Sequence, residues 1–112
     1  MASATDTELL SEMARAVVAT VHPEQVILFG SHARGDASPQ SDVDLLVVES
    51  EPFGPHRSRR EELRRIRRAL TGFRLPKDVL LYSREEVERW KDSPNHVIHR
   101  AYREGKVLHG DG

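Results

Sequence analysis

The sequence is that of a small protein with nearly balanced charge. Its 112 residues carry a formal net charge of −1, and 38% of them are hydrophobic and 31% charged, which is typical of a globular domain. This charge argues against general electrostatic attraction to nucleic acid or to an anionic membrane. The absence of cysteine excludes disulfides and thiolate metal sites. With no bilayer-length apolar run and no secretory layout over residues 1–8, we expect a soluble, cytoplasmic protein with one domain over 1–112.

The first part of the chain predicts a helix, a strand and a sharp turn. Apolar residues recur with helical spacing over 7–21, and the helix should end before Pro23, because the residue preceding a proline disfavours helical angles. The short apolar run 25–29 predicts a buried strand. Gly30 then permits a sharp reversal. Residues 31–35 should form one helical turn before a surface loop over 36–41.

Two more strands and three more helices are expected after this loop. Their predicted ranges are 42–48 (strand), 57–70 (helix), 78–82 (strand), 83 onward (helix) and 93–105 (helix), with a loop over 49–55 and a short extended segment at 107–108. Ser83 and Glu86 have the spacing of a capping box, and Gly72 can terminate the helix before the third strand. This order predicts an α+β fold, a small mixed β-sheet covered by helices mainly on one side.

The most informative segment is 30–44, which reads Gly-Ser-His-Ala-Arg-Gly-Asp-Ala-Ser-Pro-Gln-Ser-Asp-Val-Asp. A strand that breaks at a glycine and opens a helix exposes unpaired backbone N–H groups at the positive end of the helix dipole. Ser31 adds a hydroxyl donor, and Arg34 adds a guanidinium that can bind a phosphate with two hydrogen bonds. The segment therefore predicts a triphosphate pocket, although a Gly-Ser pair alone is more often an ordinary turn with a capping serine.

Three aspartates form a candidate metal site. Asp42 and Asp44 alternate on the second expected strand, so their side chains should project from one face about 6.5–7 Å apart. Asp78 should emerge at the same end of the sheet if the second and third strands are neighbours. Carboxylates arranged in this way can bind a pair of Mg²⁺ ions, and Asp78 could also accept a proton from an attacking hydroxyl. The alternative is a set of solvated aspartates at strand starts.

Taken together, Gly30-Ser31, ten intervening residues and Asp42-x-Asp44 resemble the signature of the DNA-polymerase-β-type nucleotidyltransferase superfamily. More narrowly, the chain resembles the minimal nucleotidyltransferase (MNT) antitoxins, the MntA-like partners of HEPN toxins. These carry Gly-Ser-x-Ala-Arg-Gly, then Ser-Asp-x-Asp-Leu, and a Ser-Pro…Arg-x-Gly-x-Val-Leu tail. The corresponding segments here are 30–35, 41–45, 93–94 and 103–108. The resemblance covers nearly the whole chain and implies the polymerase-β-type nucleotidyltransferase fold.

The resemblance also implies an activity and a site. The catalytic and metal-binding residues would be Asp42, Asp44 and Asp78, and the nucleotide-binding residues would be Gly30, Ser31, Arg34 and Ser41. With two Mg²⁺ ions and ATP as substrate, the chain would transfer AMP to a tyrosine hydroxyl of a partner HEPN toxin, a ribonuclease, and so neutralise it. Larger superfamily members carry an extra domain for substrate recognition. Without one, this chain would depend on a partner surface or an open cleft, as a homo-oligomer or a hetero-oligomer with the toxin.

Other interpretations of the sequence were weighed against this one. The chain could be a catalytically idle antitoxin that inhibits its toxin by occlusion only, whereas modification of a small-molecule hydroxyl is disfavoured because the chain is too short to enclose such a pocket. The arginine-rich helix 57–70 contains Glu61 and Glu62 and no interleaved aromatic residues, so direct nucleic-acid binding is disfavoured. His96 and His99 lack a third ligand in register and are interpreted as surface or packing residues.

Overall fold

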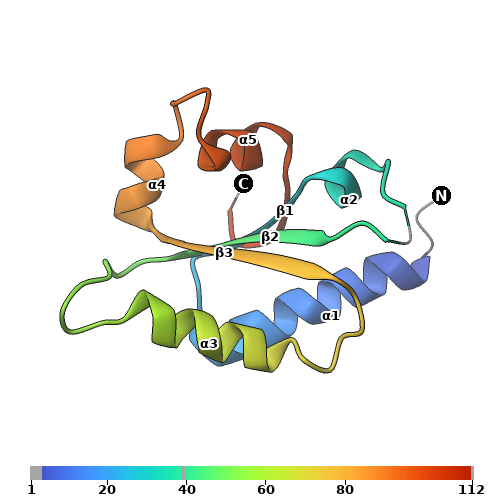
Figure 1. Cartoon of the computed structure of the whole chain (residues 1–112), viewed down its shortest axis with the longest axis horizontal. Coiled ribbons are helices and arrows are strands. Elements are labelled where there is room, and N and C mark those ends of the chain that lie inside the picture. Colours follow the sequence, from blue (N-terminus) through green and yellow to red (C-terminus); the bar gives the residue numbers. More distant parts are fainter. Residues whose placement is uncertain (1–3, 39, 112) are drawn as a thin grey trace.

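The computed structural model describes residues 4–38 and 40–111 of the chain. The elements in chain order are α1 Ala4–Val21, β1 Gln25–Phe29, α2 Ser31–Arg34, β2 Val43–Glu49, α3 Arg59–Ala69, β3 Lys77–Ser83, α4 Arg84–Trp90, α5 Val97–Glu104 and β4 Lys106–His109 (Figure 1). Helix α1 ends where the sequence predicts, and His22 then takes a left-handed φ of 50° before Pro23. The extended segment at 107–108 is part of strand β4.

A mixed sheet forms the centre of the molecule. Its four strands stand in the order β3-β2-β1-β4. Strand β1 pairs antiparallel with both β2 and β4, whereas β2 pairs parallel with β3. A parallel pair needs a long crossover connection, and here α3 supplies it. The structure thus confirms the predicted α+β class with a mixed sheet, and it places β3 and β4 at the two edges.

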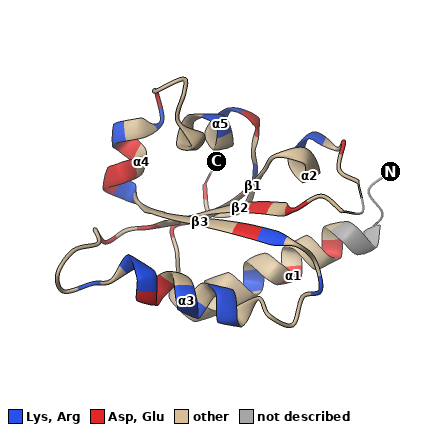
Figure 2. Cartoon of the chain, viewed as in Figure 1, with Lys and Arg blue, Asp and Glu red and all other residues tan. Residues whose placement is uncertain are grey.

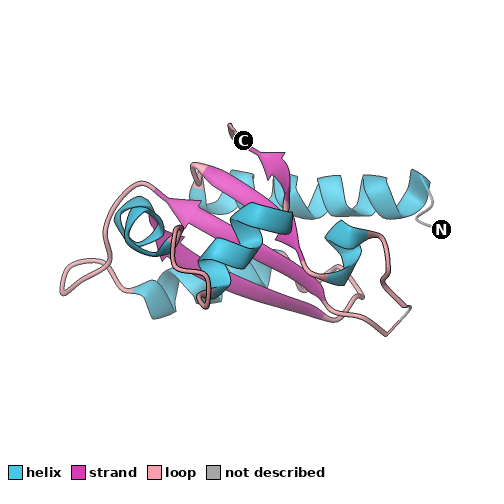
Figure 3. Ribbon diagram, turned by 90° about the horizontal axis from the view of Figure 1, so that it is seen from above, coloured by secondary structure: helices cyan, strands magenta, loops and turns pink. Residues whose placement is uncertain are grey.

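Helices cover both faces of the sheet, which differs from the expectation of one main side. Helices α1 and α3 pack on one face, and α4 and α5 pack on the other (Figures 1 and 3). The reason lies in the central strands. Every residue of β1 is buried, and so is every residue of β2 except Asp44. A strand that is apolar on both faces must be covered on both faces.

Strand β2 begins and ends differently from its prediction. It starts at Val43, so that Asp42 lies just before it, and it extends to Glu49, which the composition had assigned to a loop. The Glu49 side chain is nevertheless only 3% exposed. Arg57, from the following loop, donates a hydrogen bond to it. This contact permits a glutamate to end a buried strand, a circumstance that strand composition alone does not reveal.

The starts of the last three helices are set by side-chain caps. Helix α3 begins two residues later than predicted because Ser58 is its N-cap and accepts a hydrogen bond from the backbone N–H of Glu61. The predicted capping box of α4, with Ser83 as N-cap, is present. Helix α5 begins at Val97 rather than near residue 93, because His96 caps it. In the described part of the chain, no helix is both long enough and apolar enough to cross a membrane.

Candidate active site

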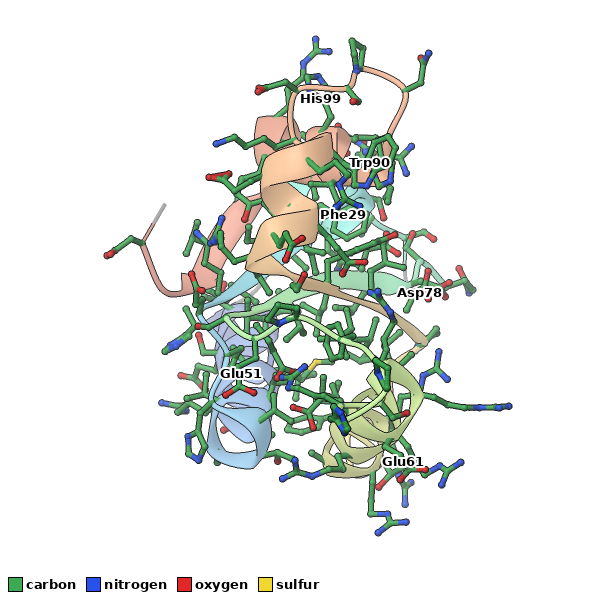
Figure 4. The ribbon with its side chains drawn as sticks, turned by 90° about the vertical axis from the view of Figure 1, so that its left-hand side faces the viewer. Phe29, Glu51, Glu61, Asp78, Trp90 and His99 are labelled. Atoms are coloured by element: carbon green, nitrogen blue, oxygen red, sulfur yellow. The ribbon has the colours of Figure 1, made fainter. Side chains whose placement is uncertain are left out.

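The predicted acids lie at the end of the sheet where β2 and β3 begin and β1 ends. In the strand register, Phe29 of β1 pairs with Asp44 of β2, and Asp44 pairs with Asp78 of β3. Residues in register on neighbouring strands, about 4.8 Å apart, project from the same face. The three residues therefore form one row across the sheet, on the face that α5 covers. Two residues of this row, Phe29 and Asp78, are labelled in Figure 4.

The next positions along the three strands are apolar, and their burial fixes where the acids lie. The next row on this face consists of Ile27, Leu46 and Leu80. The first two are buried under α5. Between the acids and this row, the opposite side of the sheet carries Leu45 and Val79, buried in the core under α1 and α3. The predicted alternation along β2 is thus observed. Burial of the apolar positions fixes the register, and the register brings Asp44 and Asp78 side by side.

Gly30 brings the β1–α2 turn directly against Asp44. It is the N-cap of α2 and has a left-handed φ of 76°. A Cβ atom built at this position would overlap Oδ2 of Asp44. Glycine is therefore required for two reasons, the backbone conformation and the space taken by the carboxylate. The turn predicted to hold phosphates and the acids predicted to hold metal are in contact.

A cavity of about 310 Å³ opens over the row formed by Phe29, Asp44 and Asp78, here called the acid row. Five of the residues predicted from the sequence line it, namely Gly30, Ser31, Arg34, Asp44 and Asp78. Helix α5 forms another part of the wall with Val97, Arg100 and Glu104. The volume lies at the lower end of the range found for small-molecule sites.

The electrostatics of Asp44 show that the acids act on one another. Burial raises the pKa of Asp44, the negative charges of Asp78 and Asp42 raise it further, and the positive charges of Arg100 and His32 oppose them. A cation between these carboxylates would relieve this repulsion. Two adjacent carboxylates beside room for phosphate oxygens and water suit Mg²⁺, which prefers oxygen ligands and retains several waters.

The third acid stands apart from the other two. Within residues 4–38 and 40–111, no three His, Cys, Asp or Glu side chains lie close enough together to hold a metal ion. Asp42 is exposed and precedes β2, and it does not line the cavity, although its charge acts on Asp44. The structure therefore presents Asp44 and Asp78 as a pair, and the role of Asp42 as a metal ligand stays a prediction.

Ser41 and Arg34 have partners within the protein. The Ser41 hydroxyl accepts a hydrogen bond from the backbone N–H of Ser38 at 2.9 Å, and the Ser41 carbonyl lies 3.2 Å from Nε2 of His32. Ser41 thus closes the loop before β2 and does not line the cavity. Arg34 does line it, and its guanidinium donates to Asp36 and Glu104, both at 3.2 Å. This bond to Glu104 joins α2 to α5.

Sequence reasoning missed the residues that α5 contributes. Val97, Arg100 and Glu104 follow the i, i+3, i+7 spacing of one helical face. This spacing could have identified the face as a unit. It could not have shown that the face lies over the acids, because that depends on how α5 packs on β1 through Ile98 and Ala101.

The other candidate residues have structural roles. The ring of His96 stacks on Trp90 with 4.8 Å between centroids, and its Nδ1 accepts a hydrogen bond from the backbone N–H of Ile98. Nδ1 of His99 lies 2.8 Å from the carbonyl of Lys91. These contacts agree with the packing interpretation of both histidines.

The arginines of α3 gather on the outer surface of that helix (Figure 2). Two of them pair within the helix, Arg64 with Glu61 and Arg65 with Glu62. Arg59 instead reaches Glu86 of α4. These ion pairs agree with a largely solvated helix surface.

Comparison with known proteins identifies the family. Residues 10–104 match the nucleotidyltransferase domain family, and the chain belongs to it. Comparison with curated proteins finds no match.

The fold is similar to those of several crystal structures. One is a Sulfolobus solfataricus protein assigned as a nucleotidyltransferase, with a TM-score of 0.57 and 28% identity over 76% of this chain and 73% of that one. A second is a toxin–antitoxin crystallised with AMP-PNP, with a TM-score of 0.59 and 18% identity over 90% and 73% of the two chains. A third contains a tri-AMPylated Shewanella oneidensis HEPN toxin in complex with an MNT antitoxin, with a TM-score of 0.50 and 14% identity over 93% and 69%. The predicted polymerase-β-type nucleotidyltransferase fold is confirmed.

Proposed function

We propose that this chain is a Mg²⁺-dependent nucleotidyltransferase that transfers AMP from ATP to a tyrosine hydroxyl of a partner HEPN toxin and thereby neutralises it. The observation that carries the proposal is the cavity in which Asp44 and Asp78 stand side by side against the Gly30 turn. This arrangement combines a carboxylate pair suited to divalent cations with a turn suited to phosphates.

Each residue of the site has a task in this reaction. Magnesium, when bound, would neutralise charge on the phosphates during transfer. Asp44 and Asp78 would hold it, with Asp42 as an outer carboxylate, and the Gly30–Ser31 turn would hold the triphosphate. Asp78, at the edge strand, would accept the proton of the attacking hydroxyl. The hydroxyl oxygen would bond to the α-phosphorus while the bond to the β-phosphate bridging oxygen breaks, and pyrophosphate would leave with that electron pair.

Two observations favour a protein as the acceptor. The described part of the chain is a single sheet with its helices, and the cavity is walled by four short segments of it, which leaves a second surface to complete the site. The toxin–antitoxin complexes among the structural neighbours have the same fold. An AMP group on a tyrosine would add a bulky anion, and such a group can block a ribonuclease site by charge and shape.

The test uses labelled ATP, Mg²⁺ and a co-encoded HEPN partner. Wild type should label the partner, and Asp44→Ala and Asp78→Ala should reduce labelling at least a hundredfold, since both remove cation-binding charge. Asp92→Ala, which removes an exposed acid from the α4–α5 loop, should label as wild type does. A partner that is inhibited but unlabelled, equally by wild type and by Asp44→Ala, would instead establish inhibition by occlusion.

A further inference from the structure

One cation of the cavity has no ion-pair partner among the described residues. Arg100 of α5 lines the cavity together with Asp44 and Asp78. The other cavity arginine, Arg34, is occupied on two sides, by Asp36 and by Glu104. Within the part of the chain that the structure describes, no carboxylate lies within 4.0 Å of the Arg100 guanidinium. All of its side-chain donors are therefore available to a ligand.

The position of Arg100 is fixed by the packing of α5. Its neighbours Ile98 and Ala101 are fully buried against the sheet. At the end of the helix, a Cβ atom on Gly105 would overlap the Ala101 carbonyl and the Ile27 side chain. The α5 backbone thus lies as close to β1 as a glycine allows. A rigid helix carries a free guanidinium over the acid row.

Arg100 also lies close enough to the acids to act on them electrostatically. Its positive charge is among those that lower the pKa of Asp44, yet the two side chains form no hydrogen bond. Glu104, one helical turn along α5, binds Arg34 on the side of the β1–α2 turn. The two arginines therefore flank the cavity with different roles. Arg34 connects α2 to α5 through its ion pair with Glu104, whereas the guanidinium of Arg100 is available to a ligand in the cavity.

From this geometry we propose that Arg100 binds the phosphate chain of the nucleotide, from the part of the cavity wall that α5 forms. The proposal rests on the proposed function, because it assigns a residue to the same site. A guanidinium offers five N–H donors in a plane and binds phosphates with paired hydrogen bonds. A nucleotide whose phosphates bind Asp44 and Asp78 through a cation would lie in the cavity that Arg100 also lines. The family motif over 30–45 does not include this residue.

The test compares the affinities of ATP, ADP and AMP in the presence of Mg²⁺, measured by titration calorimetry. Arg100→Ala should weaken ATP binding about tenfold to a hundredfold, the range of a charge-assisted hydrogen bond, and should weaken AMP binding much less. Arg100→Lys keeps the positive charge but loses the planar guanidinium, so its ATP affinity should lie between those of wild type and Arg100→Ala. Arg103→Ala, an exposed arginine on the same helix that does not line the cavity, should bind all three nucleotides as wild type does.

The outcomes separate this inference from the proposed function. If wild type binds ATP and labels its partner while Arg100→Ala retains wild-type ATP affinity, the role of Arg100 is wrong and the proposed function stands. An equal fractional loss for ATP and AMP would also overturn it, because phosphate binding must depend on phosphate number. If wild type binds no nucleotide, the proposed function itself fails. If Arg100→Ala has a lower melting temperature than wild type, the ATP and AMP affinities of Arg100→Lys are compared with those of wild type instead.

Discussion

At the residue scale, Gly30 has the most specific requirement. Gly30→Ala should lose nucleotide binding, because its methyl group would displace the Asp44 carboxylate. Its backbone, with a φ of 76° and a ψ of −156°, lies in a region that residues other than glycine rarely adopt, which adds a strain of about 1–3 kcal/mol. Gly35→Ala is the matched control, since Gly35 has a φ of 85° with no atom within 4 Å of an added Cβ. Urea unfolding should show a loss of stability in both variants, larger in Gly30→Ala because of the added overlap, whereas ATP titration should show lost binding only in Gly30→Ala. Wild-type affinity in Gly30→Ala would contradict the contact.

Glu49 gives the molecule a predicted pH dependence. Burial and the neighbouring Glu62 carboxylate raise the pKa of Glu49 to about 8, against the opposing charge of Arg57. In the unfolded chain its pKa is near the ordinary 4.5. The folded state thus retains a proton that the unfolded state has lost, so stability should fall as pH rises from about 4.5 to about 8 and then level off. Between pH 6 and pH 8 the loss should be about 2 kcal/mol.

The measurement is the melting temperature against pH for wild type and Glu49→Gln. The glutamine cannot ionise, so its profile should be flatter between pH 6 and 8. Glu51→Gln, an exposed neighbour that also contacts Arg57, should follow wild type. Nucleotide binding should not change in Glu49→Gln, because five residues of extended strand, about 16 Å, separate Glu49 from Asp44. Parallel profiles for wild type and Glu49→Gln would refute the assignment.

The sequence predicted single residues best where one local rule governs them. The Gly-Ser turn and the alternation along β2 indicated Gly30, Ser31 and Asp44, which line one cavity in the structure, and both features depend on a few consecutive residues. Asp78 depended on which strands are neighbours, and the parallel pairing of β2 and β3 decided it. Arg100 was missed because its proximity to the acids arises only when α5 packs across the sheet.

At the element scale, the Ser83 cap links β3 to α4. Ser83→Ala should cost about 1 kcal/mol through the lost N-cap, and somewhat more than Ser58→Ala at the start of α3. The reason is that Ser83 is 1% exposed and its partner Glu86 also binds Arg59, whereas the Ser58 cap is exposed to solvent. Urea unfolding of the two variants tests this order. A smaller loss in Ser83→Ala than in Ser58→Ala would contradict it.

Element boundaries show where local patterns stop being sufficient. The helices and strands occur where periodicity predicts them, and most of their ends lie within one residue of the prediction, but the largest shift, at the start of α5, is four residues. Glu49 continues β2 because Arg57 donates a hydrogen bond to it from a loop, and His96 rather than Ser93 starts α5 because its ring nitrogen caps the helix. The coverage of both sheet faces follows from the full burial of β1, a property of the assembled sheet rather than of any one segment.

At the scale of the whole molecule, the sheet and its helices form the core, and the candidate site lies at one end of the sheet. The two buried layers are built on opposite faces of the same strands. The acid row lies at the end of the sheet where β1 ends and β2 and β3 begin, beside α5. The site therefore requires little from the core except the register of three strands, which explains how a domain of 112 residues can hold it.

Ligand binding should accordingly stabilise the whole domain without refolding it. At a concentration one hundred times its dissociation constant, a ligand that binds only the folded state adds about 2.7 kcal/mol, or roughly 10–20 °C in the melting temperature of a domain of this size. ATP with Mg²⁺ should raise the melting temperature more than either alone, because the acids bind the nucleotide through the cation. In Asp44→Asn the added effect of Mg²⁺ should largely disappear, while Asp92→Asn should respond as wild type does. Equal shifts with and without Mg²⁺ in wild type would mean that the carboxylates do not bind a cation with the nucleotide.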